Sequence, residues 1–102
     1  MSETEPAVTL YTRPGCPYCS RLRRGLNASH LRYREIDIWQ DPQAAAFVRS
    51  VAGGNETVPT VVVAGHAMVN PSAARVRAAV SEHAPGQLPA QTKRRFPWLR
   101  AR

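Results

Sequence analysis

Two cysteines, Cys16 and Cys19, lie three positions apart in the stretch YTRPGCPYCSRLRRGL of this 102-residue chain. If the stretch is helical, this spacing places both thiols on one face, about 5–6 Å apart, which suits a disulfide. The pair could therefore ligate a metal, form a structural disulfide or exchange disulfides with other thiols. The surrounding residues decide among these three roles.

A metal site is not predicted. A zinc centre needs about four ligands, commonly from a second cysteine pair or a closely spaced histidine pair. The chain has no further cysteine, and its three histidines, at positions 30, 66 and 83, are far apart in the sequence. The choice is therefore between the two kinds of disulfide chemistry.

Disulfide exchange explains more of the local sequence. Pro17 suits the first position of a helix, because the N–H that it lacks would have no partner there. Cys16 then stands at the helix N-terminus, where free N–H groups and the helix dipole stabilise an anion such as a thiolate. In such places the pKa of cysteine falls from about 8.5 to between about 3.5 and 7.5. We therefore expect Cys16 to be the attacking sulfur and Cys19, which faces further inward, to be the resolving one.

A second signal is the segment TVPT, residues 57–60, directly before the β-branched run VVV. Proline is tolerated at the head of a strand because its missing N–H is not needed there. A cis peptide before Pro59 would leave the backbone groups of Val58 free and turned toward the cysteine loop. An extended disulfide substrate could then pair with Val58 as an added strand.

The hydrophobic pattern predicts an α/β domain with the order β-α-β-α-β-β-α. Two similar pairs, Asp41-Pro42 and Asn70-Pro71, mark the starts of the second and third helices. This order implies a small, mixed four-stranded sheet flanked by three helices. The predicted strands cover residues 7–12, 31–38, 59–65 and 67–69, and the predicted helices cover residues 17–28, 42–52 and 71–84.

Basic charge is concentrated in the C-terminal tail. The chain carries a net charge of +7, and residues 85–102 contain five basic residues and no acidic residue. This composition predicts a disordered, solubilising tail that follows a folded domain of residues 1–84. Contact of the tail with nucleic acid or an anionic membrane is a less favoured alternative. The polar, acidic start MSETEPAV does not resemble a signal peptide, so we expect a cytoplasmic protein.

The motifs RPGCPYC and TVPT together resemble the glutaredoxin family of the thioredoxin superfamily, over about residues 7–84. The resemblance implies a thioredoxin-like fold in which Cys16 is the nucleophile and Cys19 the resolving cysteine. It also implies a site for a small thiol, where Arg13 pairs with a ligand carboxylate and the segment around Val58 forms a backbone clamp. The residues expected to bind this thiol are Arg13, Pro17, Tyr18, Thr57, Val58, Pro59, Asn70 and Ser72.

One departure from the family pattern bears on which small thiol is bound. Glutathione-binding members usually carry a Gly-Gly-x-x-Asp-like stretch before the last helix, whereas this chain has HAMVNPSAARV. The segments AAAFVRSVAGGNETVPTV and NPSA are most similar to mycoredoxin, which works with mycothiol. A further departure is Pro-Tyr between the cysteines, where mycoredoxins usually have Gly-Tyr. The resemblance favours mycothiol over glutathione as the co-substrate.

We therefore predict a monomeric thiol–disulfide oxidoreductase, without a tightly bound cofactor, that reduces mixed disulfides between proteins and a small thiol. Its partners would be the small thiol, oxidised or thiolated client proteins and a disulfide reductase. Two alternatives stay open. A dithiol redoxin of the NrdH type would need both cysteines and would be recharged by a flavoenzyme that resembles thioredoxin reductase. An iron–sulfur binding module would share a cluster between two chains through Cys16 and small-thiol ligands.

Overall fold

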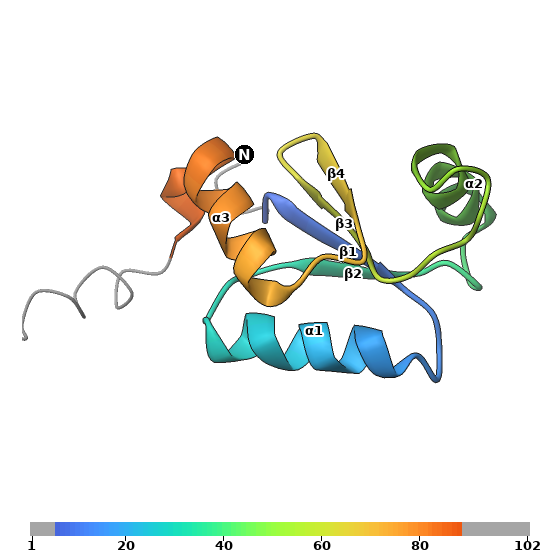
Figure 1. The fold of residues 1–102 in the computed structure, drawn as a ribbon, viewed down its shortest axis with the longest axis horizontal. Coiled ribbons are helices and arrows are strands. Elements are labelled where there is room, and N and C mark those ends of the chain that lie inside the picture. Colours follow the sequence, from blue (N-terminus) through green and yellow to red (C-terminus); the bar gives the residue numbers. More distant parts are fainter. Residues whose placement is uncertain (1–5, 89–102) are drawn as a thin grey trace, which may run out of the picture.

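Four strands form one mixed sheet in the spatial order β2-β1-β3-β4 (Figure 1). The computed structural model describes residues 6–88, and every helix in that range is too short or too polar for a bilayer span. The elements follow the predicted order, with one short 3-10 helix, η2, added at the end. Their bounds are β1 Val8–Thr12, α1 Pro17–Ala28, β2 Arg34–Asp37, α2 Pro42–Val51, β3 Thr60–Val63, β4 His66–Val69, α3 Ala73–His83 and η2 Pro85–Gln87.

Strand pairing brings two distant connections to the same edge of the sheet. β1 runs parallel to β2 and antiparallel to β3, and β3 runs antiparallel to β4. The C-terminal end of β1 therefore lies beside the start of β3, where Tyr11 pairs with Thr60. The loop to Cys16 follows β1, and the segment 57–59 precedes β3. The two meet at this edge, where the Cys16 sulfur approaches the carbonyl of Val58.

Helices cover both faces of the sheet. Figure 1 shows α1 and α2 on opposite sides of it. The main buried cluster joins α1 and α3 to one face, through residues such as Leu22, Val76 and Leu10. A second cluster joins α2 to the other face, where the rings of Tyr11 and Phe47 lie 5.3 Å apart. Both cysteines belong to this second cluster, so the packed interior holds them in place.

Side chains cap the starts of α1, α2 and α3. At α2 the carboxylate of Asp41 accepts two backbone N–H hydrogen bonds, as the sequence predicts. At α3 the sequence placed the cap at Asn70, but the cap is Ser72, whose hydroxyl accepts from the N–H of Arg75. A capping residue needs extended backbone, which Ser72 has at φ −79° and ψ 165°, whereas Asn70 is left-handed at φ 53°.

β2 is shorter than the predicted strand. It covers Arg34–Asp37 instead of residues 31–38, because the start of the predicted strand forms part of the C-terminal end of α1. The N–H groups of His30 and Leu31 donate to carbonyls in the last turn of α1, and His30 is left-handed at φ 59°. This hydrogen-bond pattern is a Schellman motif, which holds Leu31 away from the strand.

The folded body extends past the boundary predicted at position 84. Pro85–Gln87 form η2, and the side-chain oxygen of Gln87 accepts a hydrogen bond of 3.2 Å from the N–H of Ala7. Leu88 packs against the main cluster. These contacts join residues far apart in the sequence, so a local pattern could not reveal them. The tail predictions for residues 89–102 lie outside the described residues.

Candidate active site

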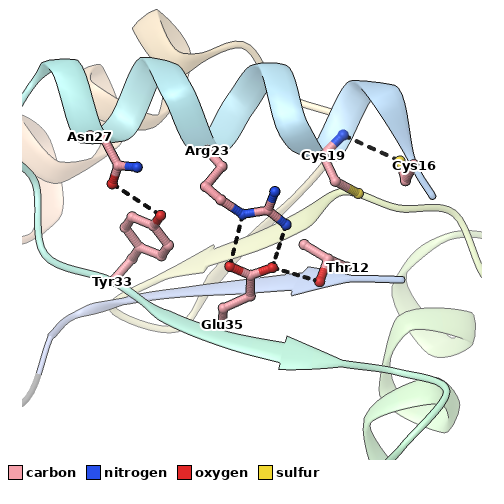
Figure 2. A network of polar contacts seen from close by, with 7 residues as sticks. All are labelled: Thr12, Cys16, Cys19, Arg23, Asn27, Tyr33 and Glu35. Atoms are coloured by element: carbon pink, nitrogen blue, oxygen red, sulfur yellow. Dashed lines mark hydrogen bonds and ion pairs between the residues drawn. The ribbon is translucent and has the colours of Figure 1, made fainter. Parts of the chain in front are cut away.

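Cys16 caps the start of α1, directly after the loop that follows β1. Its backbone is extended, with φ −91° and ψ 111°, and its sulfur accepts a hydrogen bond of 3.2 Å from the N–H of Cys19 (Figure 2). Pro17 occupies the first turn, as the sequence predicts. A sulfur in this place faces the free N–H groups at the positive end of the helix dipole, which favours the thiolate.

The pKa of Cys16 lies below its ordinary value. Burial is the largest influence and acts to raise this pKa, since a residue only 7% exposed holds a charge poorly. Hydrogen bonds from Cys19 and from the N–H of Tyr18, together with the positive charge of Arg13, outweigh burial and lower the pKa. This environment suits an attacking sulfur.

Cys19 has the opposite environment. Cys19 is only 1% exposed, and this burial raises its pKa. The hydrogen bond to Cys16 and the charge of Cys16 add to the effect, and the pKa of Cys19 is about 12. The backbone N–H of Arg13 and the charge of Arg23 act in the other direction without compensating. Both thiols are free. Once Cys16 enters a disulfide it carries no charge, so part of the pKa increase at Cys19 disappears and the Cys19 thiol becomes more reactive than before.

A pocket of about 450 Å³ opens beside Cys16, a volume that suits a small molecule. The cysteine loop, the segment before β3 and the end of β4 form its walls. Most of the predicted thiol-binding residues line it, but Ser72 does not, because its side chain caps α3, and Pro59 is fully buried. The lining consists of Arg13, Gly15, Cys16, Pro17, Tyr18, Asn55, Glu56, Thr57, Val58 and Asn70.

Sequence reasoning missed three residues of this lining: Gly15, Asn55 and Glu56. Asn55 and Glu56 directly precede the TVPT segment, but polar residues after the pair Gly53-Gly54 have the composition of any surface turn. Their closeness to TVPT is the only signal that could have found them. The pairing of β1 with β3 is what brings this turn beside the cysteines.

Arg13 supplies a fixed positive charge at the pocket. Its Nη1 donates to the backbone carbonyl of Glu56 at 3.3 Å. The carboxylate of Glu56 is paired elsewhere, with Arg49 of α2 at 2.5 Å. Because this acceptor is neutral, it does not offset the positive charge of Arg13, which can act on Cys16 and on an anionic or polar ligand.

The segment before β3 forms the wall opposite the cysteine loop. The Val58-Pro59 peptide bond is cis, the form considered for it in the sequence analysis. The carbonyl oxygen of Val58 lies 3.9 Å from the Cys16 sulfur. The hydroxyl of Thr60 donates to the carbonyl of Thr57 at 2.8 Å, which holds the turn in place. A molecule bound along this segment would lie within reach of the Cys16 sulfur.

The two pKa shifts lead to different pH profiles for alkylation. A lowered pKa moves the rise of the thiolate fraction to lower pH, so alkylation of Cys16 by iodoacetamide should reach half its plateau below the pH at which a free cysteine thiol does. In a Cys16→Ser variant, Cys19 should react only well above that pH, because burial still raises its pKa. Mass spectrometry of quenched samples gives both curves. Two coincident curves at the pH of free cysteine would contradict the difference between the thiols.

Comparison with known proteins gives a consistent result. A family model described as Glutaredoxin matches residues 8–68. A protein of Mycobacterium tuberculosis whose name assigns it to the glutaredoxins is 51% identical over 73 residues, which cover 71% of this chain and 87% of that protein. Mycoredoxin 1 of Corynebacterium glutamicum is 43% identical over 74 residues, which cover 72% of this chain and 91% of that protein.

Solved structures confirm the predicted thioredoxin-like fold. A structure of NrdH-redoxin from Escherichia coli matches with a TM-score of 0.54 and 26% identity, over 61% of this chain and 79% of that one. A buckwheat glutaredoxin in complex with glutathione matches with a TM-score of 0.64 and 19% identity, over 81% of this chain and 82% of that one. The second likeness is one of fold alone.

Proposed function

This chain belongs to the glutaredoxin family of thiol–disulfide oxidoreductases, and we propose that it reduces mixed disulfides between client proteins and mycothiol. The observation that carries the proposal is the pair of opposite pKa shifts beside one pocket, lowered at Cys16 and raised at Cys19. One reactive sulfur next to a small-molecule pocket suits attack on a disulfide that contains a small thiol.

The proposed reaction has two exchanges. The Cys16 thiolate attacks the mycothiol sulfur of the mixed disulfide, the bond to the client breaks, and the client leaves as a thiolate that takes a proton from water. A second mycothiol attacks the Cys16–mycothiol disulfide, which restores Cys16 and releases mycothiol disulfide. A disulfide reductase returns that product to the thiol. A monomer would carry out this cycle in the cytoplasm, where small thiols are kept reduced.

The polar groups of the pocket support mycothiol as the ligand. Asn55 and Asn70 offer amide groups, the carboxylate of Glu56 is already paired with Arg49, and Arg13 is the one cation among the lining residues that the structure describes. Mycothiol carries many hydroxyl groups and no carboxylate, whereas glutathione carries two carboxylates that call for cationic or N–H partners. A guanidinium can also donate to hydroxyl oxygens. The similarity to Mycoredoxin 1 supports the same ligand.

An Arg13→Gln variant separates the two small thiols. Glutamine keeps N–H donors but removes the charge, so the KM for glutathione should rise about tenfold and that for mycothiol at most about threefold. The weaker stabilisation of the Cys16 thiolate affects both reactions equally and cancels in the ratio. The assay follows reduction of a peptide–small-thiol mixed disulfide, with each thiol coupled to its own reductase. Equal or better kcat/KM of the native protein with glutathione would contradict the choice of mycothiol.

A dithiol redoxin of the NrdH type is the second candidate. The likeness to an NrdH-redoxin favours it, and so does the 3.2 Å contact between the Cys16 sulfur and the Cys19 N–H, because adjacent thiols can close an intramolecular disulfide. Such a redoxin would be recharged by a flavin-dependent reductase. Turnover with a thioredoxin reductase in the absence of any small thiol would identify it.

A further inference from the structure

A charged network lies next to the resolving cysteine, and the attack by the first cysteine makes no use of it. Cys19 and Arg23 are four residues apart on α1, so they lie one turn apart on the same face. Figure 2 shows both side chains pointing from α1 toward the sheet, where Thr12 and Glu35 lie. A positive charge therefore faces the region in which a Cys19 thiolate must form.

Arg23 is held in place by Glu35. Its Nε and one terminal nitrogen donate to the two carboxylate oxygens of Glu35 at 3.0 and 2.5 Å. The hydroxyl of the buried Thr12 donates to one of these oxygens at 3.0 Å. Two neighbouring strands, β1 and β2, thus hold the guanidinium against α1. A bidentate pair with a third hydrogen bond has a better defined geometry than an ordinary surface ion pair.

We propose that Arg23 and Glu35 are positioning residues that set, through their charges, how fast Cys19 resolves the mixed disulfide at Cys16. The nature of that disulfide rests on the proposed function. Arg23 favours the Cys19 thiolate, and its charge is among the influences that lower the pKa of Cys19. The carboxylate of Glu35 offsets part of this effect, because it brings negative charge into the same network. The two residues act in opposite directions on one step.

In this step Cys19 loses its thiol proton to water, and its sulfur attacks the sulfur of Cys16. A bond forms between the two cysteine sulfurs, the bond between Cys16 and the small thiol breaks, and the small thiol leaves as a thiolate. A nearby cation increases the fraction of Cys19 that is ready to attack. A pKa change of one unit alters this fraction about tenfold and the nucleophilicity about threefold in the opposite sense, which leaves about threefold in rate. The network therefore affects how much of the turnover uses Cys16 alone and how much uses both cysteines.

Because the chain has two cysteines, an aromatic disulfide can report both steps separately. Dithiobis(nitrobenzoate) reacts first with Cys16 and releases one coloured thiolate, and attack by Cys19 then releases a second. We expect Arg23→Met to slow the second release about threefold or more, and Glu35→Gln to accelerate it about threefold. The first release should stay unchanged in both variants. Arg24→Met, at an exposed arginine of the same helix, is the matched control and should change neither release.

Opposite signs distinguish an electrostatic role from a structural one. Each variant removes one partner of the same ion pair, so loss of structure alone would disturb both in the same direction. Arg23→Lys should keep most of the native rate of the second release, because lysine carries the same charge. Slowing in both variants, no change in either, or an equal effect of Arg24→Met would overturn the proposal. The assay contains no mycothiol, so its outcome does not depend on which small thiol the protein uses. Either proposal can therefore fail while the other holds.

Discussion

Replacing Cys16 with serine should abolish the reduction of mixed disulfides, with a loss of at least about a thousandfold in kcat/KM. The hydrogen bonds at the start of α1 that lower the pKa of this thiol cannot ionise a serine hydroxyl near neutral pH. Cys19 cannot replace it, because burial still raises the pKa of that thiol in the variant. Initial rates with a peptide–mycothiol disulfide, in the presence of mycothiol and its reductase, measure the loss.

Cys19→Ser is the matched variant, one helical turn away. Because the first attack on the mixed disulfide comes from Cys16 and does not use Cys19, this variant should keep kcat/KM within about threefold of the native value. Mycothiol then completes the cycle by itself. If both variants lose activity to the same extent, the route through Cys16 alone is wrong, and the dithiol redoxin becomes the better description.

Gly25→Ala should destabilise the protein by about 1–3 kcal/mol, although alanine is favoured over glycine inside a helix by up to about 1 kcal/mol. α1 and α3 approach closely here, and a Cβ atom on Gly25 would lie 2.6 Å from the Cβ of Ala73. Relief of this overlap requires the helices to separate, and their side chains Leu22, Leu26 and Val76 fill the main core. Denaturant unfolding followed by circular dichroism gives the change in free energy.

Ala73→Gly, introduced together with Gly25→Ala, is the control for this contact. It removes the methyl group that the new Cβ atom would meet, so the double variant should recover much of the lost free energy of unfolding. An increase in stability from Gly25→Ala alone would contradict the close approach of α1 and α3, because helix propensity would then be the larger effect.

Local patterns were sufficient for the order of the elements and for the start of two helices. A side chain that can cap, followed by proline, indicates a helix start, as at Asp41 and at Cys16. The same rule was wrong at Asn70, because it depends on residue types in a short stretch. The left-handed backbone of this residue after β4, at φ 53°, is not visible in those types. The rule also could not detect that Gln87 would return to the start of β1.

The pocket needed more than local pattern. Asn55 and Glu56 lie about forty positions from the cysteines, and only the register of β1 with β3 makes them neighbours of Cys16. The same holds for Arg23 and Glu35. They lie on α1 and β2, and parallel pairing of β1 with β2 places the carboxylate of Glu35 3.0 Å from the Nε of Arg23.

By itself, the sequence determined that a thiol would stand at a helix start, because the proline that follows and the exposed N–H groups of a first turn act over a few residues. A lowered pKa at that thiol follows from the same local pattern, but the tertiary structure alone decided that the pKa of Cys19 would be raised, to about 12. Burial and charge depend on what packs around each sulfur, and those neighbours come from strands and helices that only folding brings together.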